Sequence, residues 1–417
     1  MNINKIRFSN YKIFEKEQLL ELKPITILIG KNSSGKSSLL KLPLLIFNSF
    51  SNSNDDSLIN LKLAGLDLGY EFKDLLYNKY ETRILRFEIK FEDKKSIGTL
   101  RLGIQNIPEK DIQVITEFQL ITDSTNMEIK GEFDDQDNIL YNGSVNNVKI
   151  ENSTIEFKDL LPFKWNIGDI EIKNTIDYIN LEYRPLFESF IKKVKYLLPF
   201  RAFPKRLYDD IDINSFTHDF SGGNIPLTLL NDSSLLKKVS DWYSSNLNIE
   251  KIEIEKIDRR GRHFEVNVFQ NFSKGIPINL FDVGQGVSQS LPIVTRSFMD
   301  REDVLEIIEQ PELHLHPAAH SDIASLLVDS ALRNPSSKYL IETHSENFIL
   351  RIRRMIAEGK IQHDFVNIYW IDNDSSSSSL EKIEIDEKGE VSFWPDGIFS
   401  EAFEEVKAIR RAQRDKS

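Results

Sequence analysis

The chain is 417 residues long, and its 40% hydrophobic and 28% charged residues are typical of a soluble globular protein with two or three domains or lobes. It has no cysteine, which excludes disulfides, thiolate zinc sites and cysteine nucleophiles. The net charge of −12 argues against a broadly basic nucleic-acid-binding coat, although a local basic groove stays open. There is no apolar stretch of about 18 residues and no secretory leader pattern, so we expect a cytoplasmic protein with no membrane contact.

A glycine-rich segment from Gly30 to Ser37, Gly-Lys-Asn-Ser-Ser-Gly-Lys-Ser, lies between an apolar run and the start of a predicted helix. It matches the phosphate-loop pattern, in which backbone N–H groups wrap a triphosphate, a lysine reaches the outer phosphates and a serine hydroxyl ligates Mg²⁺. The positive end of the helix dipole adds to the same spot. The nucleotide-contacting residues predicted here are Gly30, Asn32, Ser33, Ser34, Gly35, Lys36, Ser37 and Ser38.

The first predicted strand, Asn2 to Phe8, ends in a turn with basic and aromatic side chains. A nucleotide base needs an aromatic or cationic flank, and Arg7, Tyr11 and Lys12 could supply one by stacking and charge. The alternative is an edge strand with a solvated end.

The middle of the chain is predicted to be scaffold. From Arg83 to about Ile155, short alternating stretches predict antiparallel strands. One helix is predicted from about Ile176 to Leu197, another from about Leu227 to Asn246, and a strand pair around Arg259 to Arg262. The segment from Leu198 to Arg206 gathers three cations around two prolines. It could contact phosphate, nucleic acid or a partner, or it could be a solvated loop paired with nearby acids.

Two apolar stretches in the last third of the chain end in polar residues. Val304 to Glu309 is a predicted strand, and its terminal acid lies at the carboxyl edge of a parallel sheet, where ligands of open α/β sheets bind. There Glu309 can hold the water shell of the Mg²⁺ on Ser37. Lys338 to Thr343 is a second predicted strand, which places His344 at the same edge, within reach of the γ-phosphate. A histidine at a strand end is usually structural, but the phosphate loop and the acidic strand in one chain favour a functional interpretation.

The phosphate loop, the stretch from Ile308 to Pro317 and Glu342-Thr343-His344-Ser345 together carry a resemblance. The chain resembles the ABC-type ATPases of the structural-maintenance-of-chromosomes (SMC) and OLD (overcoming lysogenization defect) class, in particular the small bacterial members that serve as anti-phage defence ATPases. The tail from Val366 to Gly389 and the stretch from Trp394 to Gly397 also resemble the C-terminal piece common in these proteins.

The resemblance implies two ATP molecules sandwiched in a head-to-head dimer. Each would be held by the phosphate loop of one protomer and by a helix-opening signature of the other. The stretch from Gly286 to Leu291 best fits this signature, so Gly286, Ser288 and Gln289 are the expected contacts across the interface. It departs from the usual Ser-Gly-Gly-Gln, and the alternative is a simple glycine turn before a buried helix.

A second departure concerns Gln310, which follows the magnesium acid directly. ABC ATPases usually carry a glutamate there to orient or activate the attacking water. A glutamine can orient water but cannot accept a proton, so hydrolysis is expected to be slow, or Glu312 acts instead. We therefore expect Gln310 or Glu312 to position the water and His344 to sense the γ-phosphate. Together with Lys36 and Glu309, these are the candidate catalytic residues.

The sequence and the resemblance predict an α/β fold, an ABC-ATPase head with a mixed, largely parallel central sheet, an antiparallel β-region and a helical insertion. Residues 1–160 are predicted to form an N-terminal ATPase lobe with the phosphate loop and the β-region. Residues 161–280 are predicted to form the helical insertion and connecting strands. Residues 281–417 are predicted to form a C-terminal ATPase lobe with the signature-like helix, the magnesium acid, the histidine and the tail.

Three functions stay open at this point. The first is an ATP-dependent sensor or regulator of a bacterial anti-phage defence complex, whose dimer controls a separate nuclease or toxin effector. Larger OLD-type enzymes carry a nuclease domain after the ATPase, and none is expected here. The second is a DNA-repair or chromosome-maintenance ATPase that loads on DNA, and the third is a slow or non-hydrolysing ATP-bound scaffold. The second predicts a salt-sensitive basic groove near Lys192, Arg201, Lys205 and Arg206.

Overall fold

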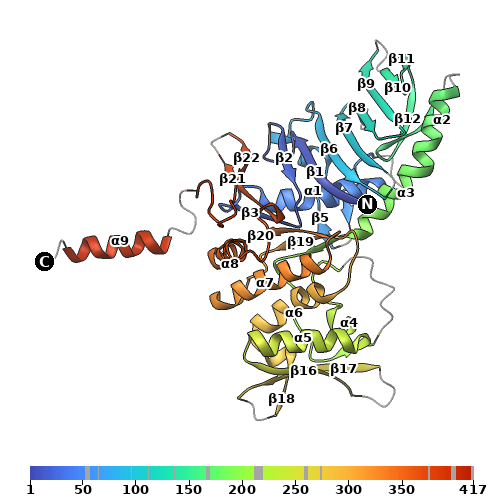
Figure 1. Ribbon diagram of the computed structural model, residues 1–417. Helices are drawn as coiled ribbons and strands as arrows, with labels where there is room; N and C mark the ends of the chain where they lie inside the picture. The colour runs from blue at the N-terminus through green and yellow to red at the C-terminus, as the bar shows by residue number, and fades with distance from the viewer. Residues whose placement is uncertain are drawn as a thin grey trace.

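The computed structural model of the chain (Figure 1) has a parallel core sheet between an antiparallel β-region and a smaller lobe. It describes residues 1–51, 57–63, 65–94, 96–110, 112–134, 138–165, 170–210, 219–257, 262–272, 275–373, 376–395 and 401–414. Residues 258–261, at the centre of the strand pair predicted around Arg259 to Arg262, and the end of the stretch from Trp394 to Gly397 therefore lie outside the described residues.

The core sheet has the strand order β14-β19-β20-β3-β21-β22. Its first five strands pair in parallel, and β22 pairs antiparallel with β21. In chain order these strands are β3 (Ile25–Gly30), β14 (Val194–Leu197), β19 (Leu305–Glu309), β20 (Lys338–Glu342), β21 (Val366–Asn373) and β22 (Ser378–Ile383).

Both faces of the core sheet are covered, which explains the continuous apolar runs of its strands. Because strand side chains alternate, Ile27 and Ile29 face one hydrophobic core while Leu28 faces another. The first of these cores includes residues of α6 (Gln285–Phe298), α7 (Pro317–Arg333) and α8 (Glu346–Ala357). The second includes α1 (Lys36–Asn48) and the antiparallel β-region.

The antiparallel β-region is an eight-stranded sheet with the order β11-β10-β9-β8-β7-β6-β1-β2. The antiparallel strands predicted between Arg83 and Ile155 are thus confirmed, as is the mixed α/β fold class. The strands of this sheet are β1 (Asn2–Ser9), β2 (Gln18–Glu21), β6 (Leu85–Glu92), β7 (Ile97–Ile107), β8 (Ile112–Ile121), β9 (Asn126–Phe133), β10 (Ile139–Val145) and β11 (Val148–Ser153). Short strands nearby are β4 (Lys62–Leu63), β5 (Leu66–Asp67), β12 (Ile155–Lys158) and β13 (Leu161–Trp165).

The helix predicted from Ile176 to Leu197 is wrong at its C-terminal end. The segment forms α2 (Ile170–Tyr178), a π-helical turn, α3 (Arg184–Phe190) and a short 3₁₀ turn, and then becomes β14. Pairing explains the change, because Val194 lies opposite Leu305 of β19 and completes the parallel sheet. Tertiary pairing here overrides the helical pattern of the residues before it.

A smaller lobe at the bottom of Figure 1 packs against α6. The helix predicted from Leu227 to Asn246 is two helices, because Asp232 ends the first and caps the second by accepting the N–H of Leu235. The elements of the lobe are β15 (Tyr208–Asp209), α4 (Ile225–Asn231), α5 (Ser233–Asn246), β16 (Ile249–Lys256), β17 (His263–Gln270) and β18 (Pro277–Asn279).

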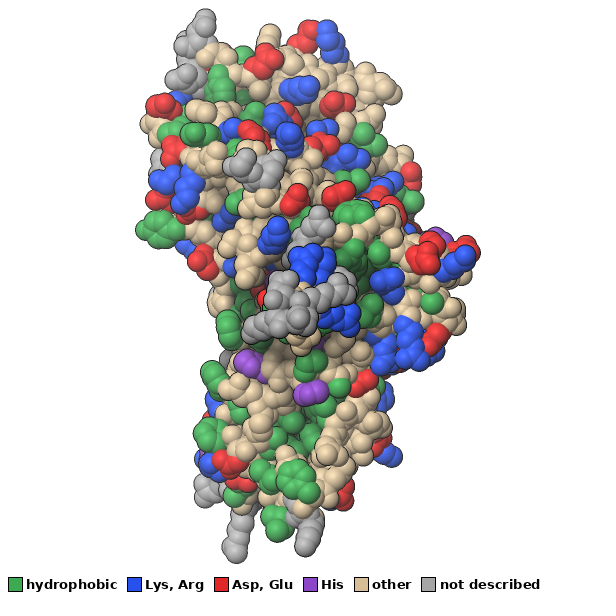
Figure 2. All heavy atoms as spheres, turned by 90° about the vertical axis from the view of Figure 1, so that its left-hand side faces the viewer, with side chains coloured by type: hydrophobic (Ala, Val, Ile, Leu, Met, Phe, Trp, Pro, Cys, Tyr) green, Lys and Arg blue, Asp and Glu red, His purple; other side chains and the backbone are tan. Residues whose placement is uncertain are grey.

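The last helix, α9 (Glu401–Arg414), projects away from the body of the molecule in Figure 1. Figure 2 shows the face on that side, with charged side chains of both signs mixed over its upper part and more hydrophobic side chains over the lower lobe. Within the described ranges, none of the helices is long and apolar enough to span a membrane.

Candidate nucleotide site

The segment between β3 and α1 forms a tight loop that only glycine permits at two positions. Gly35 has a φ of 100°, in the left-handed region. A Cβ on Gly30 would lie 2.7 Å from Oγ of Ser34. Inside the loop, the ammonium of Lys36 donates to the carbonyl oxygens of Gly30 at 2.9 Å and Lys31 at 2.8 Å. The hydroxyl of Ser34 is buried and makes no hydrogen bond within the part of the chain that the structure describes. The loop therefore has the close backbone and the free donors of an anion cradle.

The remaining predicted loop residues are arranged around this cradle. Asn32, Ser33 and Ser37 are exposed, and Ser33 has a φ of 62°. Ser38 is half-buried, and its carbonyl oxygen accepts a hydrogen bond from the hydroxyl of Tyr11 at 3.0 Å. The exposed side chains thus line the open side of the loop.

Two carboxylates lie beside the serine that ends the loop. Oγ of Ser37 is 3.5 Å from Oε2 of Glu309 and 3.2 Å from Oε2 of Glu342. The two acids lie opposite one another at the carboxyl ends of β19 and β20. Nζ of Lys36 is 3.9 Å from Oε1 of Glu342. The structure thus brings Ser37 and Glu309 together as expected, and it adds Glu342, which the sequence analysis quoted within a motif but gave no role.

Burial governs the charges of this cluster. It raises the pKa of Glu309, and Glu342 raises it further, while hydrogen bonds from Tyr196 and Ser37 act in the opposite direction. Burial lowers the pKa of Lys36, against the attraction of Glu342. Two acids side by side in a buried position favour a cation between or near them.

The donor set fits Mg²⁺, which prefers hydroxyl and carboxylate oxygens. Among the described residues there is no group of three or more His, Cys, Asp or Glu side chains suited to a metal. That is compatible with Mg²⁺ at a phosphate loop, because this ion keeps phosphate oxygens and waters as most of its ligands.

The turn after β19 holds the residues predicted to act on water. Gln310 has a φ of 44°, and its N–H donates to the carbonyl of Glu342 at 2.8 Å. Oε1 of Glu312 accepts the N–H of His344 at 2.7 Å, while its Oε2 is buried with no partner in the described part of the chain. The imidazole of His344 is 39% exposed, with Nε2 3.6 Å from Oε1 of Glu342. The turn and the end of β20 are therefore joined, and one carboxylate oxygen is left free.

Arg201 holds the backbone of this turn, a role that the sequence did not predict. Its guanidinium donates to the carbonyl oxygens of Glu309 at 2.7 Å and Gln310 at 3.0 Å. Burial lowers its pKa to about 10, so it stays charged at neutral pH. Because the side chain of Arg201 is buried, it is neither solvated nor open to the phosphate, nucleic acid or partner that were the alternatives for this loop. Arg206 is exposed and pairs with Asp282 at 2.8 Å.

The signature-like residues open α6, as expected. Gly286 lies in the first turn, and a Cβ on it would be 3.1 Å from the carbonyl oxygen of His314. Ser288 is buried, and its hydroxyl donates to the carbonyl of Gln285 at 3.2 Å. Oε1 of the buried Gln289 accepts the backbone N–H of Arg201 at 3.2 Å. The Ser288 and Gln289 side chains thus bond within their own chain, and contacts across an interface stay a prediction.

Tyr11 does not form the predicted base flank, whereas a contact of Arg7 or Lys12 with a base stays a prediction. Tyr11 is 1% exposed, and its ring packs edge-on against Phe8, so neither of its faces is open to a base. Its aromatic ring belongs to the core, and its hydroxyl donates to the carbonyl of Ser38 in the first turn of α1. Arg7 forms ion pairs with Glu17 and Glu88 on the antiparallel sheet, each at 3.2 Å.

A phosphate loop between a core strand and a helix, with acids at the ends of two neighbouring parallel strands, is the arrangement of P-loop nucleotide-binding proteins. Residues 25–351 match the family described as "AAA domain, putative AbiEii toxin, Type IV TA system", and the chain belongs to this family of AAA-type ATPase domains. Residues 361–409 match a second family, described as "Protein of unknown function (DUF3696)". No curated protein matches the chain.

Solved SMC head domains are similar to the chain at low sequence identity. An SMC head bound to the C-terminal winged-helix domain of ScpA has a TM-score of 0.48 and 10% identity, over 92% of this chain and 98% of that one. The SMC head domain from Thermotoga maritima gives 0.43 and 11%, over 92% and 100%. The head domain with an extended coiled coil bound to the C-terminal domain of ScpA, derived from Pyrococcus furiosus, gives 0.45 and 9%, over 98% and 99%.

Proposed function

We propose that the chain binds ATP with Mg²⁺ at this site and hydrolyses it slowly. The observation that carries the proposal is the meeting of Ser37, Glu309 and Glu342 at the mouth of the phosphate loop. These three oxygen donors would hold Mg²⁺, and the bound ion would neutralise charge on the phosphates. The ammonium of Lys36 donates here to two carbonyl oxygens of the loop, and it can turn from them to the outer phosphates of a bound ATP.

For the hydrolytic step, we assign the proton acceptor to Glu312. Its Oε1 is fixed by the N–H of His344, and its free Oε2 can accept a hydrogen bond from a water. Gln310 can orient the same water but cannot take its proton. His344 lies beside Glu342 with an exposed imidazole and is the candidate sensor of the γ-phosphate. We expect slow hydrolysis because Glu312 lies two positions after the place of the usual glutamate, and Gln310, which occupies that place, is neutral.

We further propose that ATP joins two copies head to head, with the start of α6 facing the nucleotide of the other copy. Gly284 and Gln285 are exposed at this helix start, where N–H groups are free for an anion. Arg201 bonds both to Gln289 of α6 and to the carbonyl of Glu309. Those contacts support movement of the helix start and the acidic edge as one unit.

The cellular role we propose is that of sensor or regulator in an anti-phage defence complex, with a separate nuclease or toxin as effector and a cytoplasmic location. Its support is the motif resemblance together with the family, whose description names a putative toxin of a type IV toxin–antitoxin system. Loading on DNA has less support, because Arg201 is buried and Arg206 is paired, which removes half of the expected groove. The hypothesis of a non-hydrolysing scaffold is still supported by Gln310, because a glutamine cannot accept a proton from water.

Nucleotide binding and single-turnover hydrolysis separate these proposals. Lys36→Ala should abolish ATP binding, whereas Lys90→Ala, on an exposed position of β6, should bind ATP as the wild type does. Slow release of phosphate by the wild type supports the enzyme, and ATP that stays intact throughout supports the scaffold. Equal ATP binding by both variants contradicts the site itself.

The role is tested by the mass and composition of the complex purified from the native host, with and without ATP and Mg²⁺. A fixed-stoichiometry complex with a nuclease-like or toxin-like protein supports the regulator. A lone dimer that forms only with ATP, and whose hydrolysis DNA stimulates, favours DNA maintenance instead.

A further inference from the structure

A cavity of about 200 Å³ lies beside β14, between the segment that enters α4 and the C-terminal end of α6. None of its lining residues belongs to the phosphate loop, although one of them, Tyr196, also donates to Glu309 of the nucleotide site. Three cations line it, and the polar lining residues that matter here are Lys195, Asp219, Asn224, Arg296 and Arg301.

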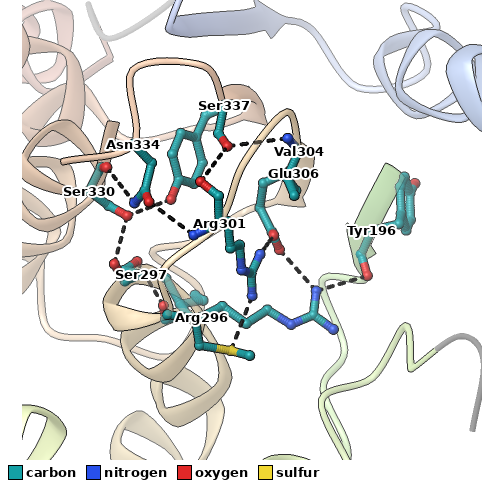
Figure 3. A network of polar contacts seen from close by, with 12 residues as sticks. Tyr196, Arg296, Ser297, Arg301, Val304, Glu306, Ser330, Asn334 and Ser337 are labelled. Atoms are coloured by element: carbon teal, nitrogen blue, oxygen red, sulfur yellow. Dashed lines mark hydrogen bonds and ion pairs between the residues drawn. The ribbon is translucent and has the colours of Figure 1, made fainter. Parts of the chain in front are cut away.

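One buried carboxylate serves two of these cations (Figure 3). Glu306 is 2% exposed; its Oε1 accepts from Arg296 at 3.0 Å and its Oε2 accepts from Arg301. Both terminal nitrogens of Arg296 have oxygen acceptors, because it also donates to the carbonyl oxygens of Tyr196 at 3.2 Å and of Asp219. Arg301 is not, because its second terminal nitrogen meets only the sulfur of Met299 at 3.3 Å, a weak acceptor.

Lys195 is the third cation of the cavity. Its ammonium makes no hydrogen bond or ion pair with any residue that the structure describes. Asp219 does not serve it either, because its carboxylate accepts the N–H groups of Gly223 at 3.0 Å and Asn224 at 2.8 Å. Burial lowers the pKa of Lys195, and the charges of Arg301 and Arg296 lower it further, while Glu306, which lies opposite Lys195 on β19, raises it. The cavity therefore has more positive than negative charge, with donors left over.

We propose that this cavity binds a phosphate group, held by Lys195 and by the unused donors of Arg301. A tetrahedral oxyanion offers several acceptors to such a pair of cations. The volume suits a phosphate with a few waters but is smaller than the pockets that enclose whole nucleotides. The group is either the free ion or a phosphomonoester whose remaining part stays in solvent.

The site lies one residue away from the candidate nucleotide site along β14. Arg296 holds the carbonyl of Tyr196, whose hydroxyl donates to Glu309. A phosphate beside Lys195 thus lies next to the strand that orients the magnesium acid, although this inference does not depend on ATP binding.

The test is the affinity of the full chain for inorganic phosphate, measured by equilibrium dialysis. Lys195→Gln should weaken binding about tenfold, the size expected for loss of one charged donor, and Lys195→Arg should retain it. Lys192→Gln removes the same charge from a neighbouring exposed position and should bind as the wild type does. Phosphate held by the phosphate loop is recognised by its loss in Lys36→Ala, so the two sites are distinguishable. Equal affinity of the wild type and Lys195→Gln would overturn the proposal.

Thermal unfolding gives a second measurement of phosphate binding. Phosphate should raise the unfolding midpoint of Lys36→Ala but not that of the double variant with Lys195→Gln. Glycerol 3-phosphate in place of phosphate separates the two sources: a shift with both ligands assigns a phosphomonoester, and a shift with phosphate alone assigns the free ion. No shift with either ligand contradicts the site.

Discussion

The hydroxyl of Tyr196 donates a hydrogen bond to the carboxylate of Glu309, across the outermost pair of strands in the core sheet. Burial raises the pKa of Tyr196 far above its ordinary value, so the hydroxyl stays a donor at working pH. One oxygen of Glu309 is thereby held, and the other is left facing Ser37. The edge strand β14 thus takes part in forming the candidate site.

Tyr196→Phe should weaken the response of nucleotide binding to Mg²⁺. The hydrogen bond from Tyr196 opposes the rise that burial causes in the pKa of Glu309, so its loss lets that pKa rise further. More of the acid is then protonated at lower pH, and the midpoint of an Mg²⁺ titration should rise several-fold near pH 6 and less near pH 8. Tyr141→Phe, which loses a buried bond to Ile115 in the antiparallel sheet, is the matched control. An equal response of the two variants contradicts the assignment.

Glu309→Gln should stabilise the protein when neither nucleotide nor metal is present. The pKa of Glu309 is raised in the folded state, so folding favours its protonated form, and stability falls as pH rises through the range between the ordinary and the raised pKa. The amide removes this cost, and urea unfolding near pH 7 should give a gain of about 1 kcal/mol that shrinks towards pH 4.

The matched control is Glu132→Gln, at an exposed position of β9. It should show no such pH-dependent gain. A loss of stability in Glu309→Gln at neutral pH would mean that the carboxylate is already compensated in the folded protein.

Features at the ends of single strands could be predicted from the sequence. The phosphate loop and Glu309 follow an apolar run directly, His344 comes just after the end of β20, and a parallel sheet brings such positions to one edge. The contacts of Tyr196 and Arg201 with Glu309 could not be predicted, because they join residues more than 100 positions apart through the pairing of β14 with β19. Tyr11 was misjudged for a related reason, since the sequence does not say which side of a turn faces the core.

Glu312→Gln tests the residue that accepts the proton. The amide oxygen can still accept the N–H of His344, so the turn should keep its shape, while single-turnover hydrolysis should fall about 10²-fold because the base is lost. Gln310→Glu offers the converse change and should raise the rate if water lies within its reach. Unchanged hydrolysis in Glu312→Gln would move the role to another group.

Arg201 and Arg206 lie five residues apart in one loop, and they provide a matched pair for the last prediction. Arg201→Met leaves the carbonyls of Glu309 and Gln310 without a buried charged donor, so unfolding in urea should show a loss of about 2–4 kcal/mol. Arg206→Met removes an exposed ion pair with Asp282 and should not change stability measurably. The same two variants also test the hypothesis that the protein loads on DNA. A large loss of DNA affinity in Arg206→Met, at unchanged stability, would revive the basic groove at its exposed end.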